Sequence, residues 1–163
     1  THLTKIKGRN VLFIVNASNR YTLAMTDIEP RNWNYYTMYI RSVIHGVMQE
    51  MGYSEDQIGQ YFKMSGDTTV TKTHGRKSVG GINRMVMDAQ YFGKKLEKEA
   101  KYQWELSEYL NRDICQPEGF DTYGYPSELF KLDMERLGIA AKREPAKVID
   151  FAQYIENNCG TND

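Results

Sequence analysis

The sequence has few cysteines and no long apolar run. Cys115 and Cys159 lie far apart and form no CxxC pair, so neither a disulfide framework nor a zinc site is expected. No segment approaches the roughly 20 apolar residues that a membrane-spanning helix needs, and no signal-peptide pattern opens the chain. The expectation is a cytoplasmic protein of a reducing compartment, with no membrane partner and no bound metal.

Motifs of catalysis are also missing. His2, His45 and His74 have no metal-ligand spacing, and neither a GxSxG motif nor a P-loop spacing occurs. The acidic residues of the segment 94–108 alternate with basic ones at helical spacing, which is typical of a solvated helix face. The sequence therefore assigns no catalytic residue and no cofactor, and it leans towards a function other than catalysis.

Charge is balanced over the 163 residues but is divided unevenly along them. Residues 1–85 contain 11 Lys and Arg against 6 Asp and Glu, whereas residues 86–163 contain 10 against 15. The two halves can attract each other within the fold, or they can leave a basic face for an anionic partner. Both interpretations stay open at this point.

Apolar patterning predicts a small sheet and several helices. The apolar run 11–15 and the alternating segment 21–25 indicate a β-hairpin, and the β-branched segment 68–72 indicates a third strand. Helical spacing follows at 33–51. Ser54 and Gln57 match a capping box that opens a second helix, expected to end near residue 64.

A long amphipathic helix is expected beyond Ser78, to about residue 111. After a loop at 116–125, Pro126 and Pro145 each suit the first position of a C-terminal helix. The order is thus ββααβα plus C-terminal helices. This predicts an α+β fold with a three-stranded, mainly antiparallel sheet, one face of which is covered by helices. We expect an α+β domain at 1–111 and a helical extension, 112–163, packed on it.

The candidate functional site is the basic segment 72–83, which runs from the predicted third strand into a helix start. Unpaired N–H groups and the positive end of the helix dipole meet there, and Gly80 and Gly81 would let a ligand or another chain approach the backbone. Together they predict an anion site, for phosphate or carboxylate. The anion-binding candidates are Lys72, Thr73, Arg76, Lys77, Ser78 and Asn83, supported by Asn16, Arg20 and His74. The alternative is a capped helix after a solvated turn, with Arg76 paired to an acid from the second half of the chain.

A second basic cluster precedes Asp27, the first acidic residue. It consists of Lys5, Lys7, Arg9 and Arg20. If the predicted third strand pairs beside the hairpin, both clusters would share one side of the sheet and could track phosphates. Aromatic side chains available for base stacking would be Tyr21, Tyr35 or Trp33.

Three segments together resemble an uncharacterised bacterial domain of unknown function, over about residues 5–95. They are RNVLFIVNASNRYTLAM, YSEDQIGQYFKMSGD and TVTKTHGRKSVGGINRM. The family also forms the N-terminal part of proteins similar to a plasmid open-reading-frame product. Its pattern has an apolar strand ending in Asn, then Lys-Thr-x-x-Arg, Ser-Val and Gly-x-x-Asn. The residues that match are Asn16, Asn19, Arg20, Tyr21, Lys72, Thr73, Arg76, Gly80 and Asn83, with Ser78 and Val79 displaced by one position.

The resemblance implies a fold and a site but no activity, and its link to mobile elements favours a nucleic-acid or toxin–antitoxin context. Three hypotheses follow. The first is a binding module for an anionic partner, either nucleic acid or an acidic protein. The second is an interaction or assembly domain that uses its helical surface, which includes a homo-oligomer. The third is a small nuclease or toxin-like enzyme that uses His74 and Arg76.

Overall fold

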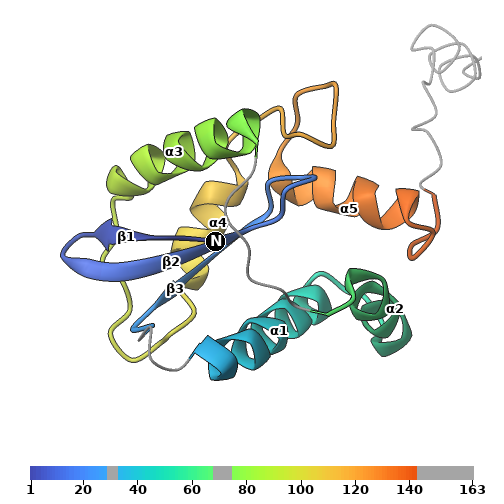
Figure 1. Ribbon diagram of the computed structural model, residues 1–163, viewed down its shortest axis with the longest axis horizontal. Helices are drawn as coiled ribbons and strands as arrows, with labels where there is room; N and C mark the ends of the chain where they lie inside the picture. The colour runs from blue at the N-terminus through green and yellow to red at the C-terminus, as the bar shows by residue number, and fades with distance from the viewer. Residues whose placement is uncertain (29–32, 68–74, 143–163) are drawn as a thin grey trace, which may run out of the picture.

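The computed structural model describes residues 1–28, 33–67 and 75–142 (Figure 1). Within these residues three strands form one antiparallel sheet in the order β1-β2-β3, and five helices follow them. The predicted α+β class and three-stranded antiparallel sheet are confirmed. The strands are β1 (His2–Ile6), β2 (Arg9–Val15) and β3 (Thr22–Thr26), and the helices are α1 (Trp33–Glu50), α2 (Glu55–Ser65), α3 (Arg76–Gln90), α4 (Trp104–Asn111) and α5 (Pro126–Arg136).

The third strand of the described sheet comes from the start of the chain. β1 pairs with β2 through a two-residue turn, Lys7-Gly8, in which both residues have positive φ (48° and 82°), as the commonest hairpin turn requires. The strand predicted at 68–72 lies outside the described residues. Sequence reasoning did not identify β1, whose alternation is weak because a lysine and a histidine stand among its few apolar residues.

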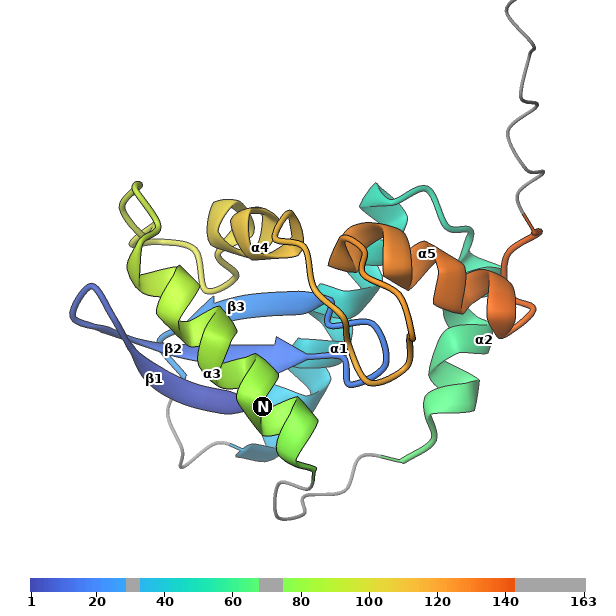
Figure 2. The ribbon, with the colours of Figure 1, turned by 90° about the horizontal axis from the view of Figure 1, so that it is seen from above.

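Both faces of the sheet are covered, so the expectation of a single covered face is wrong. Figure 2 shows α3 and α4 on one side of the sheet and α1 on the other. Successive side chains of a strand point to opposite faces. Val11 and Phe13 therefore pack with α3 and α4, while Leu12 packs towards α1. The continuous apolar run in β2 is the sequence signature of a strand buried on both faces.

The predicted long helix, from Ser78 to about residue 111, is wrong as well. α3 ends at Gln90, and α4 is a separate helix that begins at Trp104. The segment between them forms backbone hydrogen bonds with the free edge of β3. The Thr26 N–H donates to the Lys101 carbonyl (2.7 Å), and the Gln103 N–H donates to the Ala24 carbonyl (2.9 Å). A continuous helix would leave these edge groups without backbone partners.

α4 completes this edge with side chains spaced four residues apart. The Ser107 hydroxyl accepts from the Ala24 N–H at 2.9 Å. The Asn111 amide accepts from the Thr22 N–H and donates to the Thr22 carbonyl, both at 2.8 Å. Gln103, Ser107 and Asn111 are all buried. These three polar residues therefore form a buried stripe that covers an open strand edge.

The remaining helices follow the local signals of the sequence. The Ser54–Gln57 capping box opens α2 as predicted, and Pro126 stands at the start of α5. Phe130 and Met134 of α5 pack into the cluster that α1, α2 and β3 share. The helix predicted after Pro145 lies outside the described residues, and the domain boundary at 111 stays a prediction. None of the described helices has the length and apolarity needed to cross a membrane.

Candidate functional site

The start of α3 differs from the prediction by three residues. The helix begins at Arg76, and its N-cap residue is Gly75, whose φ of 87° favours glycine. Ser78 is therefore not the cap; it lies in the first turn with Arg76 and Lys77. Because the cap residue has no side chain, it offers no oxygen to the first-turn N–H groups. Of the other predicted site residues, Lys72, Thr73 and His74 lie outside the described residues. The side chains of Arg76, Lys77 and Ser78 are not described either. The alternative in which Arg76 pairs with an acidic residue is therefore untested.

Arg20 and Gly81 are the predicted features that the structure brings together. Arg20 sits in the β2–β3 loop with a φ of 67°, a left-handed conformation that is uncommon outside glycine. Its N–H donates to the Asn16 carbonyl (2.9 Å), and its carbonyl accepts from the Thr22 hydroxyl (2.9 Å). These bonds hold the backbone of Arg20, and its guanidinium lies directly against the bare backbone of α3 at Gly81.

The close approach depends on the missing side chain of Gly81. A Cβ built there would overlap the Nη1, Cζ and Nη2 atoms of Arg20. The same atom built at Gly80 would meet nothing within 4 Å among the described residues. The sequence suggested that these glycines admit a ligand or another chain to the backbone. The group that the structure places there is the protein's own guanidinium.

The positive charge of Arg20 has no carboxylate partner within the described part of the chain. The nearby Arg84 is different, since its Nε donates to both oxygens of Asp88 at 3.1 Å. Asn16 has a structural role, because its side-chain oxygen accepts from the Ser18 N–H at 2.9 Å within the hairpin loop. Asn83 is exposed on α3. Arg20 is thus the predicted cation whose backbone is held by the loop and whose charge has no carboxylate partner within the described residues.

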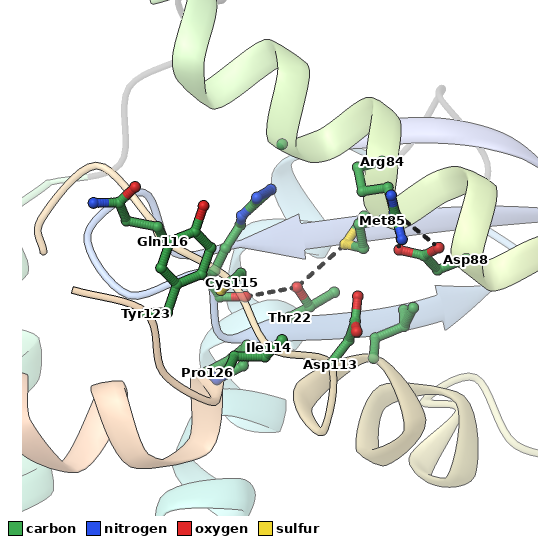
Figure 3. A pocket seen from close by; sticks show the side chains of 13 residues that line it. Thr22, Arg84, Met85, Asp88, Asp113, Ile114, Cys115, Gln116, Tyr123 and Pro126 are labelled. Carbon is green, nitrogen blue, oxygen red and sulfur yellow. Dashed lines mark hydrogen bonds and ion pairs between the residues drawn. The ribbon is translucent and has the colours of Figure 1, made fainter. Parts of the chain in front are cut away.

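Arg20 borders a cavity of about 380 Å³ between α3, the start of β3 and the segment that links α4 to α5 (Figure 3). Its volume lies in the range of small-molecule sites. The linking segment is closed on itself by paired backbone bonds between Cys115 and Gly124, at 2.9 and 3.0 Å. The cavity is lined by Arg20, Thr22, Gly81, Arg84, Met85, Asp88, Leu110, Asp113, Ile114, Cys115, Gln116, Tyr123 and Pro126.

Cys115 lies half-buried in this cavity. Burial is the largest influence on its thiol and raises its pKa; Arg20 opposes this rise, and Asp113 adds to it. The thiol is therefore protonated at neutral pH and is not activated as a nucleophile. Sequence reasoning missed Asp113, Cys115 and Tyr123 as site residues, because their segment meets Arg20 only if the predicted long helix is broken.

Apart from Arg20, Lys7 and Arg9 of the second basic cluster do not join this cavity. Arg9 pairs with Asp27 at 2.6 Å, and the Lys7 ammonium donates to the Lys94 carbonyl at 2.7 Å. β2 begins at Arg9 and ends where it pairs with the start of β3, next to Arg20. The two cations thus lie at the end of the sheet opposite Arg20. The shared basic surface stays a prediction, because the strand at 68–72 on which it depends lies outside the described residues.

Tyr21 is not available for stacking on a base. It is buried, and its ring lies 5.2 Å from that of Phe130, centroid to centroid. Burial raises the pKa of its hydroxyl. Tyr35 is exposed, but it belongs to α1 on the other face of the sheet. Within the described residues, no group of three or more His, Cys, Asp or Glu side chains is placed to hold a metal ion.

Comparison with known proteins supports the resemblance found in the sequence. Neither a search of curated proteins nor a search of solved structures gave a match. A family model described as "Domain of unknown function (DUF6933)" matches residues 1–129. Every residue that lines the cavity lies within this range. The bacterial and mobile-element context stays an expectation. Because the match covers well over half of the 163 residues, the chain belongs to this family of domains of unknown function.

Proposed function

We propose that the protein is a binding module that holds an anionic group in the cavity beside α3, with the Arg20 guanidinium as its principal contact. The observation that carries the proposal is the position of this guanidinium: it lies against the bare Gly81 backbone and has no carboxylate partner within the described residues. The guanidinium is only half-buried and borders the cavity, so an anion that enters the cavity can reach it. It also offers paired N–H groups that match a phosphate or a carboxylate.

The surroundings of Arg20 favour an anion as well. The guanidinium meets α3 at Gly81, in the N-terminal half of the helix and beyond its first turn. The helix dipole favours an anion on this half of α3 over the C-terminal half, but the effect is small beyond the first turn, so the guanidinium is the main source of positive potential in the cavity.

The described cations favour a site for one discrete group over a track for a polyanion. Arg84 and Arg9 are neutralised by Asp88 and Asp27, and Lys7 lies at the far end of the sheet. The bound group can belong to a nucleic acid, to an acidic protein or to a small molecule. These sources differ in salt dependence, because a single-stranded nucleic acid loses affinity with a slope of about −0.7 in log K against log salt for each phosphate contact.

Titration calorimetry with inorganic phosphate at low salt tests the proposal. The variant Arg20→Gln keeps the side-chain length and removes the charge. We expect it to bind phosphate about 10- to 100-fold more weakly, since hydrogen bonds to charged groups contribute about 1.5–3 kcal/mol. Arg41→Gln is the matched control: it makes the same charge change on α1, where the guanidinium lies 4.4 Å from the centroid of the Phe62 ring. Absence of phosphate binding by the wild type, or equal binding by Arg20→Gln, would overturn the proposal.

A further inference from the structure

The cavity that contains Arg20 also contains a carboxylate. Asp113 follows the C-cap residue of α4, and its side chain projects into the space between α4 and α3 (Figure 3). Within the described residues, its carboxylate forms neither an ion pair nor a hydrogen bond. An acidic group beside the cavity is unexpected in a site for anions alone, because it would repel them.

The nearby cations do not neutralise Asp113. Arg84 forms an ion pair with Asp88. The Arg112 guanidinium forms one with the Glu108 carboxylate at 3.2 Å, and Glu108 lies one helical turn before Arg112. Arg20 lines the same cavity as Asp113, yet the two do not form an ion pair. The cavity therefore presents one unpaired positive group, which is half-buried, and one unpaired negative group, which is exposed.

Arg20 and Asp113 line the same cavity. Cys115 also lines the cavity, and both charges influence the pKa of its thiol: Arg20 lowers it and Asp113 raises it. The walls of the cavity also include apolar side chains from three parts of the chain: Met85, Leu110 and Ile114. Such a lining suits a short carbon skeleton with a charged group at each end.

We propose that the cavity takes a small dipolar molecule, which carries an acidic group bound by Arg20 and a protonated amine bound by Asp113. This inference rests on the proposed function and names the ligand class of the same site. A dipolar ligand satisfies both unpaired groups at once, whereas a simple anion satisfies Arg20 and is repelled by Asp113. Asp113 thus selects among anions.

Two probes that differ only in the amine test the inference by titration calorimetry at pH 7 and low salt. Phosphoethanolamine and ethyl phosphate share the phosphate, and only the first carries an ammonium group. We expect the wild type to bind phosphoethanolamine about fivefold more tightly, the upper range for an exposed ion pair. The pair β-alanine and propionate repeats the comparison with a carboxylate and shows which acidic group the site prefers.

Three variants assign the effect to residues. Asp113→Asn should bind both members of a pair equally, with the simple anion bound at least as well as by the wild type. Arg20→Gln should lose both members. Asp121→Asn, a change of the same kind at an exposed position of the same segment and away from the cavity lining, should keep the preference.

The outcomes separate this inference from the proposed function. If the wild type binds both members of each pair equally, or if Asp113→Asn keeps the preference, the dipolar ligand is refuted while anion binding at Arg20 stands. If none of the four probes binds, the proposed function fails together with the inference. Thermal unfolding of each variant shows whether a loss of binding reflects a loss of fold.

Discussion

Replacing Gly81 with alanine should separate binding from folding. The added Cβ would overlap three atoms of the Arg20 guanidinium. The head group therefore has to move by about 1–2 Å to restore ordinary contact distances of about 3.5–4.0 Å. Because the displaced atoms are the far end of a flexible side chain, the fold can accommodate the change without moving the backbone of α3.

We expect Gly81→Ala to change stability and binding affinity in opposite directions. Alanine is more favourable than glycine within a helix by about 1 kcal/mol, so Gly81→Ala should unfold at the wild-type temperature or a few degrees above it. Binding should weaken, because the displaced guanidinium loses its charge-assisted hydrogen bonds to the anion. These contribute about 1.5–3 kcal/mol, which corresponds to about a 10- to 100-fold loss of affinity.

Gly80→Ala is the matched control for this change. It adds the same methyl group to the same helix and gains the same propensity, but within the described residues its Cβ meets no atom closer than 4 Å. We expect it to bind phosphate as the wild type does. Differential scanning calorimetry and phosphate titration of the three proteins suffice for the comparison. Wild-type affinity in Gly81→Ala, or an equal loss in both variants, would refute the reasoning about Arg20.

The remaining predictions concern stability and the first turn of α3. Asn111→Ala should lower the free energy of unfolding in urea by about 2–4 kcal/mol, because it leaves two buried backbone groups of the β3 edge unsatisfied, whereas Ala at the exposed Gln60 should change it by less than about 0.5 kcal/mol. Burial raises the pKa of Tyr102 to about 12 from 10.0; unfolded tyrosine ionises first, so stability should fall as pH rises from 10 to 12, with a shallower fall in Tyr102→Phe. Replacing Arg76 and Lys77 together with Ala should weaken phosphate binding without lowering the melting temperature, and unchanged affinity would limit the site to the cavity.

Local signals in the sequence were enough for much of the fold. The apolar run of β2, the capping box at Ser54 and the proline at the start of α5 each act over a few residues, so periodicity and cap chemistry identify their elements. β1 was not predicted because its alternation of apolar and polar residues is weak and its burial depends on contacts with α3. A content of β-branched residues thus does not by itself show which segment supplies the third strand of the sheet.

The break between α3 and α4 could not be predicted from helical spacing. Residues 91–103 contain charges at spacings that suit a helix, but the free edge of β3 needs backbone partners, and that need is a tertiary effect. The same effect hid the buried stripe that ends at Asn111. In isolation, polar residues four apart indicate a solvated face, and only the strand edge beside them makes burial favourable.

The candidate site was predictable in part for the same reason. Arg20 and the pair of glycines were identified from their types and positions, because a cation and bare backbone suit an anion. Their mutual contact was not foreseen, since it requires α3 to lie across the β2–β3 loop. Asp113 was absent from the prediction because its segment reaches the cavity only after the chain turns back at the end of α3.

The central claim is that an anion binds at Arg20, against the backbone of Gly81. The most direct measurement is a phosphate titration at low salt, followed by ¹H–¹⁵N NMR of the Gly81 amide and the Arg20 Nε–H. We expect saturable shifts of both resonances with one shared dissociation constant, and smaller shifts at Lys7 and Arg9. Shifts confined to the Lys7–Arg9 turn, or no saturable shift at Arg20, would contradict the account.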